Sequence, residues 1–140
     1  MTLGLARRGA DTAAAVANLI AFLETGHAPD GTFAPEAFCD VTLPRWRAQT
    51  TSADEIVAAR RQFHPCPGTV HVERMERTEH GFTLEFVERW QDQGEEWMSR
   101  EMIRADVTDG TITEMSVYCT GDWDTARRRE HAASVTLVRP

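Results

Sequence analysis

The stretch EFVERWQDQGEEWMSRE, residues 85–101, decides the fold of this chain. Aromatic and β-branched residues lead up to Gln93-Gly94 and continue beyond it, which is typical of two antiparallel strands joined by a tight turn. A two-residue turn places Asp92 opposite Glu95, and side chains then alternate between the two faces of the sheet. In this register, acids and tryptophans share one face, so the hairpin places carboxylates beside residues that a sheet normally buries.

Turn signals on both sides extend the pattern to four antiparallel strands. The dipeptides at 80–81 (His-Gly) and 109–110 (Asp-Gly) each predict a two-residue turn. Counting outward from the turns predicts these cross-strand pairs: Glu79 with Phe82, Thr108 with Thr111, Glu101 with Tyr118, Glu73 with Glu88, and Trp97 with Asp122.

The same register divides the side chains of the strands between two faces. One face carries nearly all the aromatic residues, so we expect helices to cover it. The members of this face that we single out are His71, Glu73, Phe86, Glu88, Trp90, Trp97, Ser99, Glu101, Tyr118 and Asp122. The opposite face mixes arginines with the apolar residues Val87, Met98, Met102, Met115 and Val117. Soluble proteins expose single apolar side chains, but five on one face are more than this usual exposure. We therefore predict a homodimer formed through this face.

The first forty residues predict helices. Asp11 is a good N-cap for a helix over residues 12–25, and Gly26 is suited to end it. A turn and a short second helix are expected in the segment 27–38, where Pro35 suits a first helical position.

A first strand and a third helix follow. Residues 40–49 have strand character, and Pro44 indicates an edge position or a bulge there. Ser52 and Glu55 form a capping box that opens the third helix, which must end before Pro65.

Composition narrows the class of protein. The chain has 140 residues, which suits one domain, and 41% hydrophobic with 26% charged residues is ordinary globular usage. A net charge of -7 argues against nucleic acid or anionic membrane as a partner. The three cysteines form no C-x-x-C pair and indicate reduced thiols in a cytoplasmic protein. No dinucleotide fingerprint, P-loop or nucleophile elbow is present, and the scattered histidines do not indicate a metal site.

The order of elements resembles the nuclear transport factor 2-like (NTF2-like) superfamily, in its branch of SnoaL-like polyketide cyclases and steroid isomerases. The resemblance rests on FCDVTLPRW (38–46) entering the first strand and VTDGTITEMSVYCTGDWD (107–124) as the last hairpin. It implies an α+β cone, in which a strongly bent antiparallel sheet wraps around three N-terminal helices. The whole chain, 1–140, would be a single domain of this kind, with 124–140 as a C-terminal tail.

The resemblance also implies a site. SnoaL-like cyclases carry a catalytic aspartate in an Asp-Trp dipeptide of the last strand. Here Asp122-Trp123 is the Asp-Trp that follows Asp109-Gly110, and it lies several residues further from that turn than the aspartate of the cyclases does. Asp122 is thus the expected general base and Tyr118 the hydrogen-bond donor to a developing oxyanion. Glu88 and Glu101 are the reserve catalytic acids. The residues expected to bind the ligand are His71, Glu73, Phe86, Trp90, Trp97 and Ser99.

Two functions from different classes remain open at this stage. The first is an enzyme without cofactor or metal that uses acid/base chemistry for cyclisation, isomerisation or dehydration of a hydrophobic, polycyclic small molecule. Opposed carboxylates such as Glu73 and Glu88 support it, since each destabilises the other's charge. The second is a non-catalytic module that binds a small molecule or dimerises. Neutralisation of the acids by Arg74, Arg100 or Arg104, with tryptophan filling the cone, would favour the second.

Overall fold

The computed structural model describes residues 2–140, over which it has three helices and six strands. In chain order they are α1 (Thr2–Thr25), β1 (Phe33–Leu43), β2 (Trp46–Thr50), α2 (Ala53–Phe63), β3 (Gly68–Arg77), β4 (Gly81–Asp92), β5 (Glu95–Thr108), β6 (Thr111–Cys119) and α3 (Thr125–Ser134). All six strands form one sheet in the order β2-β1-β6-β5-β4-β3. The pairing of β1 with β6 is parallel, and the other neighbours pair antiparallel.

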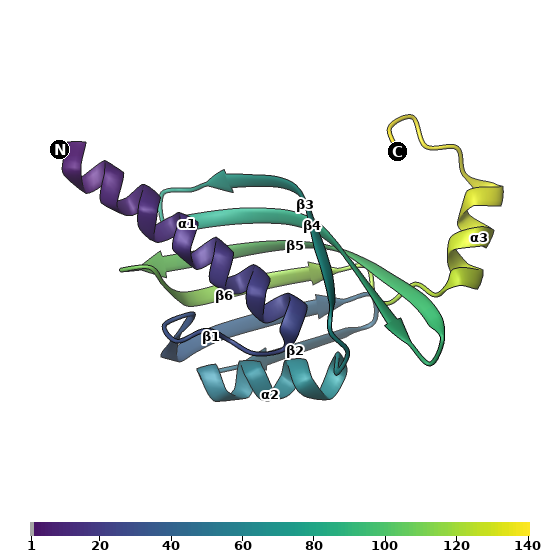
Figure 1. Cartoon of the computed structure of the whole chain (residues 1–140), viewed down its shortest axis with the longest axis horizontal. Coiled ribbons are helices and arrows are strands. Elements are labelled where there is room, and N and C mark those ends of the chain that lie inside the picture. The colour runs from purple at the N-terminus through teal and green to yellow at the C-terminus, as the bar shows by residue number, and fades with distance from the viewer. Residues whose placement is uncertain (1) are drawn as a thin grey trace.

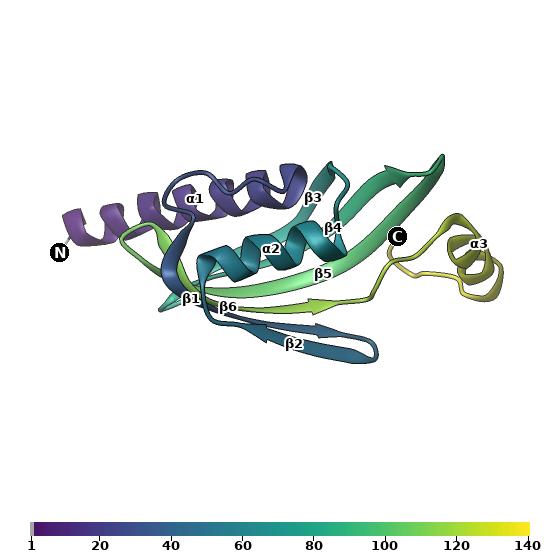
Figure 2. The same ribbon diagram turned by 90° about the horizontal axis from the view of Figure 1, so that it is seen from below.

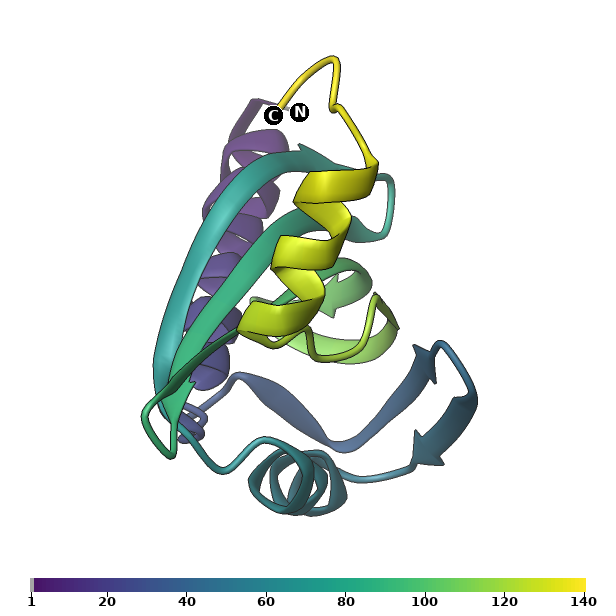
Figure 3. The same cartoon turned by 90° about the vertical axis from the view of Figure 1, so that its right-hand side faces the viewer.

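The sheet is curved, and α1 and α2 lie on the same side of it (Figures 1 and 2). The view from the end shows the sheet curling around these helices, as expected for an α+β cone (Figure 3). The largest fully buried side chains fill the space between the sheet and the helices: Leu19, Phe22, Phe82, Leu84, Phe86, Ile103 and Ile112. The third helix follows the sheet rather than preceding it, and α3 lies beyond the end of the β4–β5 hairpin (Figure 2).

The predicted register of β4 and β5 is confirmed over its whole length. Pairing runs without a shift from Gly81 opposite Asp106 to Asp92 opposite Glu95. Gln93 and Gly94 both have positive φ, 52° and 77°, which suits a two-residue turn whose twist matches that of the strands. The face that carries Phe86 therefore also carries Glu101, because these two residues lie directly opposite each other.

The predicted register of β6 is correct at its start and wrong beyond a bulge. Thr108 lies opposite Thr111 as predicted, but the pairing shifts by one residue after Ile112. Since one extra residue exchanges the two faces of a strand, Glu101 lies opposite Cys119 and Tyr118 lies on the opposite face, where it is 59% exposed.

The predicted register of β3 is also wrong. The two-residue turn falls at Glu79-His80, one residue early, because Thr78 donates its backbone N–H to the carbonyl of Gly81. A second bulge lies at Glu73, between the pairs that Val72 and Arg74 make with β4. Val70, not Glu73, therefore lies opposite Glu88, and His71 points to the outer face opposite Val87.

The first helix is longer than predicted, and the short second helix does not exist. Residues 2–25 are all helical, so Asp11 lies within α1, while Gly26 ends the helix at φ 76° as expected. The segment predicted as a helix after Pro35 belongs to β1, which pairs with β6. The β1–β6 register is interrupted between Phe33 and Phe38, so the interruption spans Pro35, a residue that has no N–H to give to a strand partner.

The next elements follow the sequence more closely. The strand expected at residues 40–49 is a hairpin, β1 and β2, that turns at Pro44 and Arg45. The predicted N-cap is present: the Ser52 side chain accepts the backbone N–H of Glu55 at 3.1 Å, and α2 ends at Phe63. The Glu55 carboxylate accepts the hydroxyl of Thr51 at 3.2 Å, so the reciprocal half of the capping box does not form.

The shift in β6 also changes the apolar outer face. Met115 and Val117 face the core, where Met115 is 4% exposed, so the outer face keeps only Val87, Met98 and Met102 of the predicted set. The homodimer stays a prediction, with a smaller apolar surface behind it.

Replacing Gly81 with alanine should destabilise the fold, because a Cβ there would overlap the backbone carbonyl of Ala105 on the neighbouring strand. We expect the free energy of unfolding in urea to fall by roughly 1–3 kcal/mol or more, the cost of overpacking. Gly4→Ala is the matched control: it has open space around it in α1, so stability should be unchanged or rise by up to about 1 kcal/mol. Equal stability of the Gly81→Ala variant and the parent would refute the close approach of β4 and β5.

Candidate active site

Three polar side chains are buried on the inner face of the sheet, beyond the aromatic core. Glu88 on β4 is 3% exposed, and Ser99 and Glu101 on β5 are 1% and 8% exposed. Glu88 lies opposite Ser99, so Glu101 is the diagonal neighbour of Glu88 on the same face. The Ser99 hydroxyl donates to Oε1 of Glu101 at 2.7 Å. Strand alternation alone thus brings two carboxyl groups and a hydroxyl together.

Arg60 of α2 supplies the positive charge of this cluster. Its Nη2 lies 2.5 Å from Oε1 of Glu88, and its Nη1 lies 3.3 Å from Oε2, so the pair is bidentate. Nη2 also donates to the backbone carbonyl of Leu23 at 2.7 Å, which ties α2 to the end of α1. The Arg60 side chain is only 13% exposed, so the ion pair is largely buried.

The two glutamates have opposite protonation preferences. Burial raises the pKa of Glu101 well above its ordinary value of 4.5, and the charge of Glu88 raises it further. Burial also acts to raise the pKa of Glu88, but the hydrogen bond from Glu101 and the charge of Arg60 outweigh it, and the net pKa is lowered. Burial and the neighbouring carboxylate thus favour the protonated form of Glu101, while Arg60 favours the ionised form of Glu88, as expected for two carboxyls that share one proton.

A neutral imidazole lies beside this pair. His64, at the C-terminal end of α2, packs edge-on against the ring of Trp90 with 4.3 Å between ring centroids. Both its ring nitrogens are buried and without a hydrogen-bond partner among residues 2–140. Burial lowers the pKa of His64, and the charge of Arg60 lowers it further. An unpaired neutral imidazole can accept a proton.

Asp122 and Cys119 border the same region. Gly121, with φ 78°, turns the chain before Asp122, and the backbone of Trp123 then pairs with Met98 of β5. Partial burial raises the pKa of Asp122, which also lies within the fields of His64 and Glu88. Burial and the charge of Glu101 raise the pKa of the Cys119 thiol to about 12, so it is not a thiolate. The helix after it is capped by Asp124, which leaves Asp122 free of that structural role.

The structure brings together some of the residues singled out from the sequence. Phe86, Glu88, Trp90, Trp97, Ser99 and Glu101 share the inner face of β4 and β5, and Asp122 lies at its edge. His71, Glu73 and Tyr118 do not join them. Glu73 is exposed at the β3 bulge and accepts from Arg100 at 2.8 Å, so the expected Glu73–Glu88 pair does not form.

Arg60 and His64 were missed by the sequence reasoning, although a signal was present. They follow Ile56 at intervals of four residues, and Ile56 is the buried residue of α2. Residues at this spacing lie on one helical face, so both side chains point where Ile56 points, towards the sheet.

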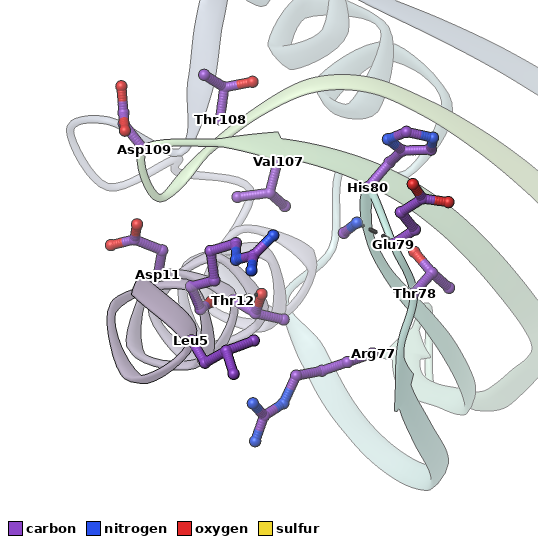
Figure 4. A pocket seen from close by; sticks show the side chains of 13 residues that line it. Leu5, Asp11, Thr12, Arg77, Thr78, Glu79, His80, Val107, Thr108 and Asp109 are labelled. Atoms are coloured by element: carbon purple, nitrogen blue, oxygen red, sulfur yellow. Dashed lines mark hydrogen bonds between the residues drawn. The ribbon is translucent and has the colours of Figure 1, made fainter. Parts of the chain in front are cut away.

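Two hollows in the surface lie away from this cluster. One, of about 460 Å³, lies between the first half of α1, the β3–β4 turn and the β5–β6 turn (Figure 4). It has charges of both signs, with Asp11 and Asp109 at one end and Arg77 near the other. The second, of about 390 Å³, lies on the outer side of the sheet next to α3. Neither contains Glu88, Glu101 or Asp122.

Within residues 2–140, no group of three or more His, Cys, Asp or Glu side chains is arranged to hold a metal ion. Over the same residues, no helix is long and apolar enough to cross a membrane. The three cysteines are free.

Comparisons with solved structures identify the fold. An NTF2-like protein from Anabaena variabilis superimposes with a TM-score of 0.66 at 14% identity, over 83% of this chain and 91% of that chain. An LEH-like epoxide hydrolase of M. tuberculosis gives 0.63 at 12% identity, over 79% and 83%. IdmH, a candidate polyketide cyclase from Streptomyces antibioticus, gives 0.55 at 17% identity, over 77% and 91%. The expected NTF2-like fold is confirmed, together with its likeness to a polyketide cyclase. No family model matches the sequence, and no curated protein is significantly similar to it.

Glu101→Gln should change how stability depends on pH. A carboxyl whose pKa is raised by folding stabilises least at high pH: its contribution declines as pH rises from the unfolded value of 4.5 towards the raised value. In that window the wild type should lose up to about 1.4 kcal/mol per pH unit relative to the variant, whose amide can still donate to Glu88. His64 acts in the opposite direction but is common to both proteins. Urea unfolding from pH 4 to 9 would measure the difference, and parallel curves would contradict a protonated Glu101.

Arg60→Met should be strongly destabilising, because it leaves Glu88 buried without its cation. We expect a loss of about 3–5 kcal/mol at pH 7, and recovery of much of it when Glu88→Gln is added. Arg47→Met is the control, since Arg47 pairs with Asp40 on an exposed hairpin and its removal should matter little. Thermal unfolding of the four proteins would test this, and equal effects of the two arginine changes would show that the Arg60–Glu88 pair is not buried as described.

Proposed function

We propose that this NTF2-like protein is a cofactor-free enzyme that transfers protons on a hydrophobic, polycyclic small molecule, in a cyclisation, isomerisation or dehydration. One observation carries the proposal: the carboxyls of Glu88 and Glu101, whose pKa values are shifted in opposite directions, are buried beside an imidazole that has no hydrogen-bond partner within residues 2–140. Such a cluster costs folding free energy, and groups with strongly perturbed pKa values gather at functional sites.

Each group has a role in the proposed chemistry. Glu101 favours its protonated form, and its proton can be redirected from Glu88 to the carbonyl oxygen of a ligand as negative charge develops on that oxygen. Arg60 and Glu88 act as positioning residues, because the ion pair fixes the carboxylate that accepts from Glu101. Asp122, with its raised pKa and partial exposure, is the proton acceptor facing the entering ligand. His64 is a second acceptor close by.

The apolar contacts needed by a ring-shaped ligand lie on the same face. Trp90 and Trp97 are cross-strand partners, and Trp97 is only half-buried. Their indoles offer a flat apolar wall next to the acids, which would orient a planar ring system and exclude water. The similarity in fold to an epoxide hydrolase and a candidate polyketide cyclase is compatible with acid/base chemistry on such ligands.

A second candidate is a non-catalytic module that binds a small molecule or dimerises. Neutralisation of acids by arginine favours it: Arg100 pairs with Glu73 and Arg60 with Glu88, while Trp90 is buried. The neutral Glu101 and the unpaired His64 weigh against it, because a purely structural cluster gains nothing from them. Activity separates the two.

Asp122→Asn should abolish most of the catalysis while leaving the fold intact. The direct assay is isomerisation of β,γ-unsaturated cyclic ketones in D2O, followed by NMR as deuterium enters next to the carbonyl. Loss of the base should lower turnover by roughly two to four orders of magnitude, with ligand binding and melting temperature nearly unchanged. Asp124→Asn, which alters the neighbouring cap of α3, is the matched control and should keep its activity. Normal turnover by Asp122→Asn would assign the base elsewhere, with Glu88 or His64 next.

The pH profile separates the acid from the base. The rate should rise as Asp122 loses its proton and fall again when Glu101 loses its own, which gives a bell whose alkaline side belongs to Glu101. Glu101→Gln should remove that alkaline decline. A variant that keeps the full bell would show that Glu101 is not the hydrogen-bond donor.

A further inference from the structure

The hollow beside α3 is lined by basic side chains, although the protein as a whole is acidic. It is lined by Arg89, Met98, Arg100, Thr120, Trp123, Arg128, His131 and Leu137. Three arginines and a histidine are among these residues and no acid is, although the net charge of the protein is -7. The acids that pair with the arginines are not part of the lining: Glu73 bonds Arg100, and Glu96 pairs with both Arg128 and Arg89.

The floor of the hollow is rigid and apolar. Met98 lies opposite Arg89 in the β4–β5 pairing, and the backbones of Met98 and Trp123 exchange hydrogen bonds of 3.0 and 2.7 Å. The backbone of Trp123 is thus fixed to the sheet, and its ring lies 5.4 Å from the His131 ring, centroid to centroid. Leu137, from the segment after α3, completes the wall and is 56% exposed.

The helix that borders the hollow is fastened to the sheet by polar contacts. Thr125 donates its backbone N–H to the Glu95 carboxylate at 3.0 Å, and Arg128 donates to Glu96 at 2.8 Å. Asp124 caps the helix by accepting from the backbone N–H of Arg127 at 2.8 Å. The hollow is therefore a formed feature of the folded chain, and a ligand would not have to order α3 on binding.

We propose that this hollow is a second ligand site, separate from the buried acids, and that it binds small amphipathic anions such as aromatic carboxylates or sulfonates. Charge complementarity selects the anion, because Arg100 and Arg128 keep donor groups beyond those used by Glu73 and Glu96. Trp123 and Met98 take the apolar ring, and the volume of about 390 Å³ is within the range of sites for small molecules. The two faces of the sheet then bind different ligands. The inner face offers a carboxylic acid that can donate a hydrogen bond, and the outer face offers arginine side chains that bind an anion.

The test uses 8-anilinonaphthalene-1-sulfonate with the intact protein, followed by the rise in dye fluorescence and by energy transfer from tryptophan. The neutral comparison is N-phenyl-1-naphthylamine, which has the same rings and no sulfonate. We expect saturable binding of the sulfonate with a dissociation constant on the order of tens of micromolar, and binding of the neutral dye at least about tenfold weaker.

Variants locate the site. Arg100→Gln and Arg128→Gln should each weaken the sulfonate about fivefold or more and leave the neutral dye unchanged, while Trp123→Leu should weaken both dyes. Arg104→Gln is the matched control on the same face of β5, outside the hollow, and should bind as the parent does. Circular dichroism of every variant shows whether it is folded. Equal affinity for the two dyes, no saturable binding, or the same loss in Arg104→Gln as in Arg100→Gln would each overturn the proposal.

Discussion

The antiparallel pairing of β4 with β5 continues without a shift from the Gly81 end to the Gln93-Gly94 turn, and the other parts of the molecule are placed by it. Its alternation puts Phe82, Leu84 and Phe86 under α1 and α2, and then continues to Glu88 on the same face. The face that buries the aromatic side chains therefore also buries the acids that follow them along the strands. The acids beside the tryptophans are thus a consequence of one uninterrupted register.

Burying the carboxyl groups of Glu88 and Glu101 costs folding free energy, and α2 partly offsets this cost. A carboxylate at 3% exposure needs a partner, and α2 supplies it through Arg60. The second carboxyl, Glu101, forms no ion pair within residues 2–140, and burial raises its pKa instead. Replacing such a cluster with apolar residues of similar volume is often neutral or stabilising in proteins, so its presence is weak support for stability and better support for a chemical role. His64 beside it supports the same conclusion, because its ring nitrogens have no hydrogen-bond partner in the described part of the chain.

The sequence predicted those features that depend on local signals. The β4–β5 turn, the N-cap at Ser52 and the helix stop at Gly26 were readable because each rests on a few neighbouring residues. The two bulges were not readable, since an extra residue at Glu73 or near Thr113 leaves no mark in the hydrophobic pattern and is set by how distant strands meet. Each bulge exchanged the faces beyond it, which removed His71 and Tyr118 from the predicted site. Arg60 belongs to α2, and its contact with β4 could not be predicted by counting residues along the strands.

The proposed chemistry requires Glu101 to be a neutral acid held next to an ionised Glu88. The most direct measurement is a titration of the side-chain carboxyl carbons by NMR, with the two signals assigned from the Glu101→Gln and Glu88→Gln variants. We predict that Glu101 titrates well above its ordinary value of 4.5 while Glu88 titrates below it, and that removing Glu88 brings the pKa of Glu101 down. If both carboxyls titrated together near the ordinary value, the cluster would be a solvated pair and the proposed acid would not exist.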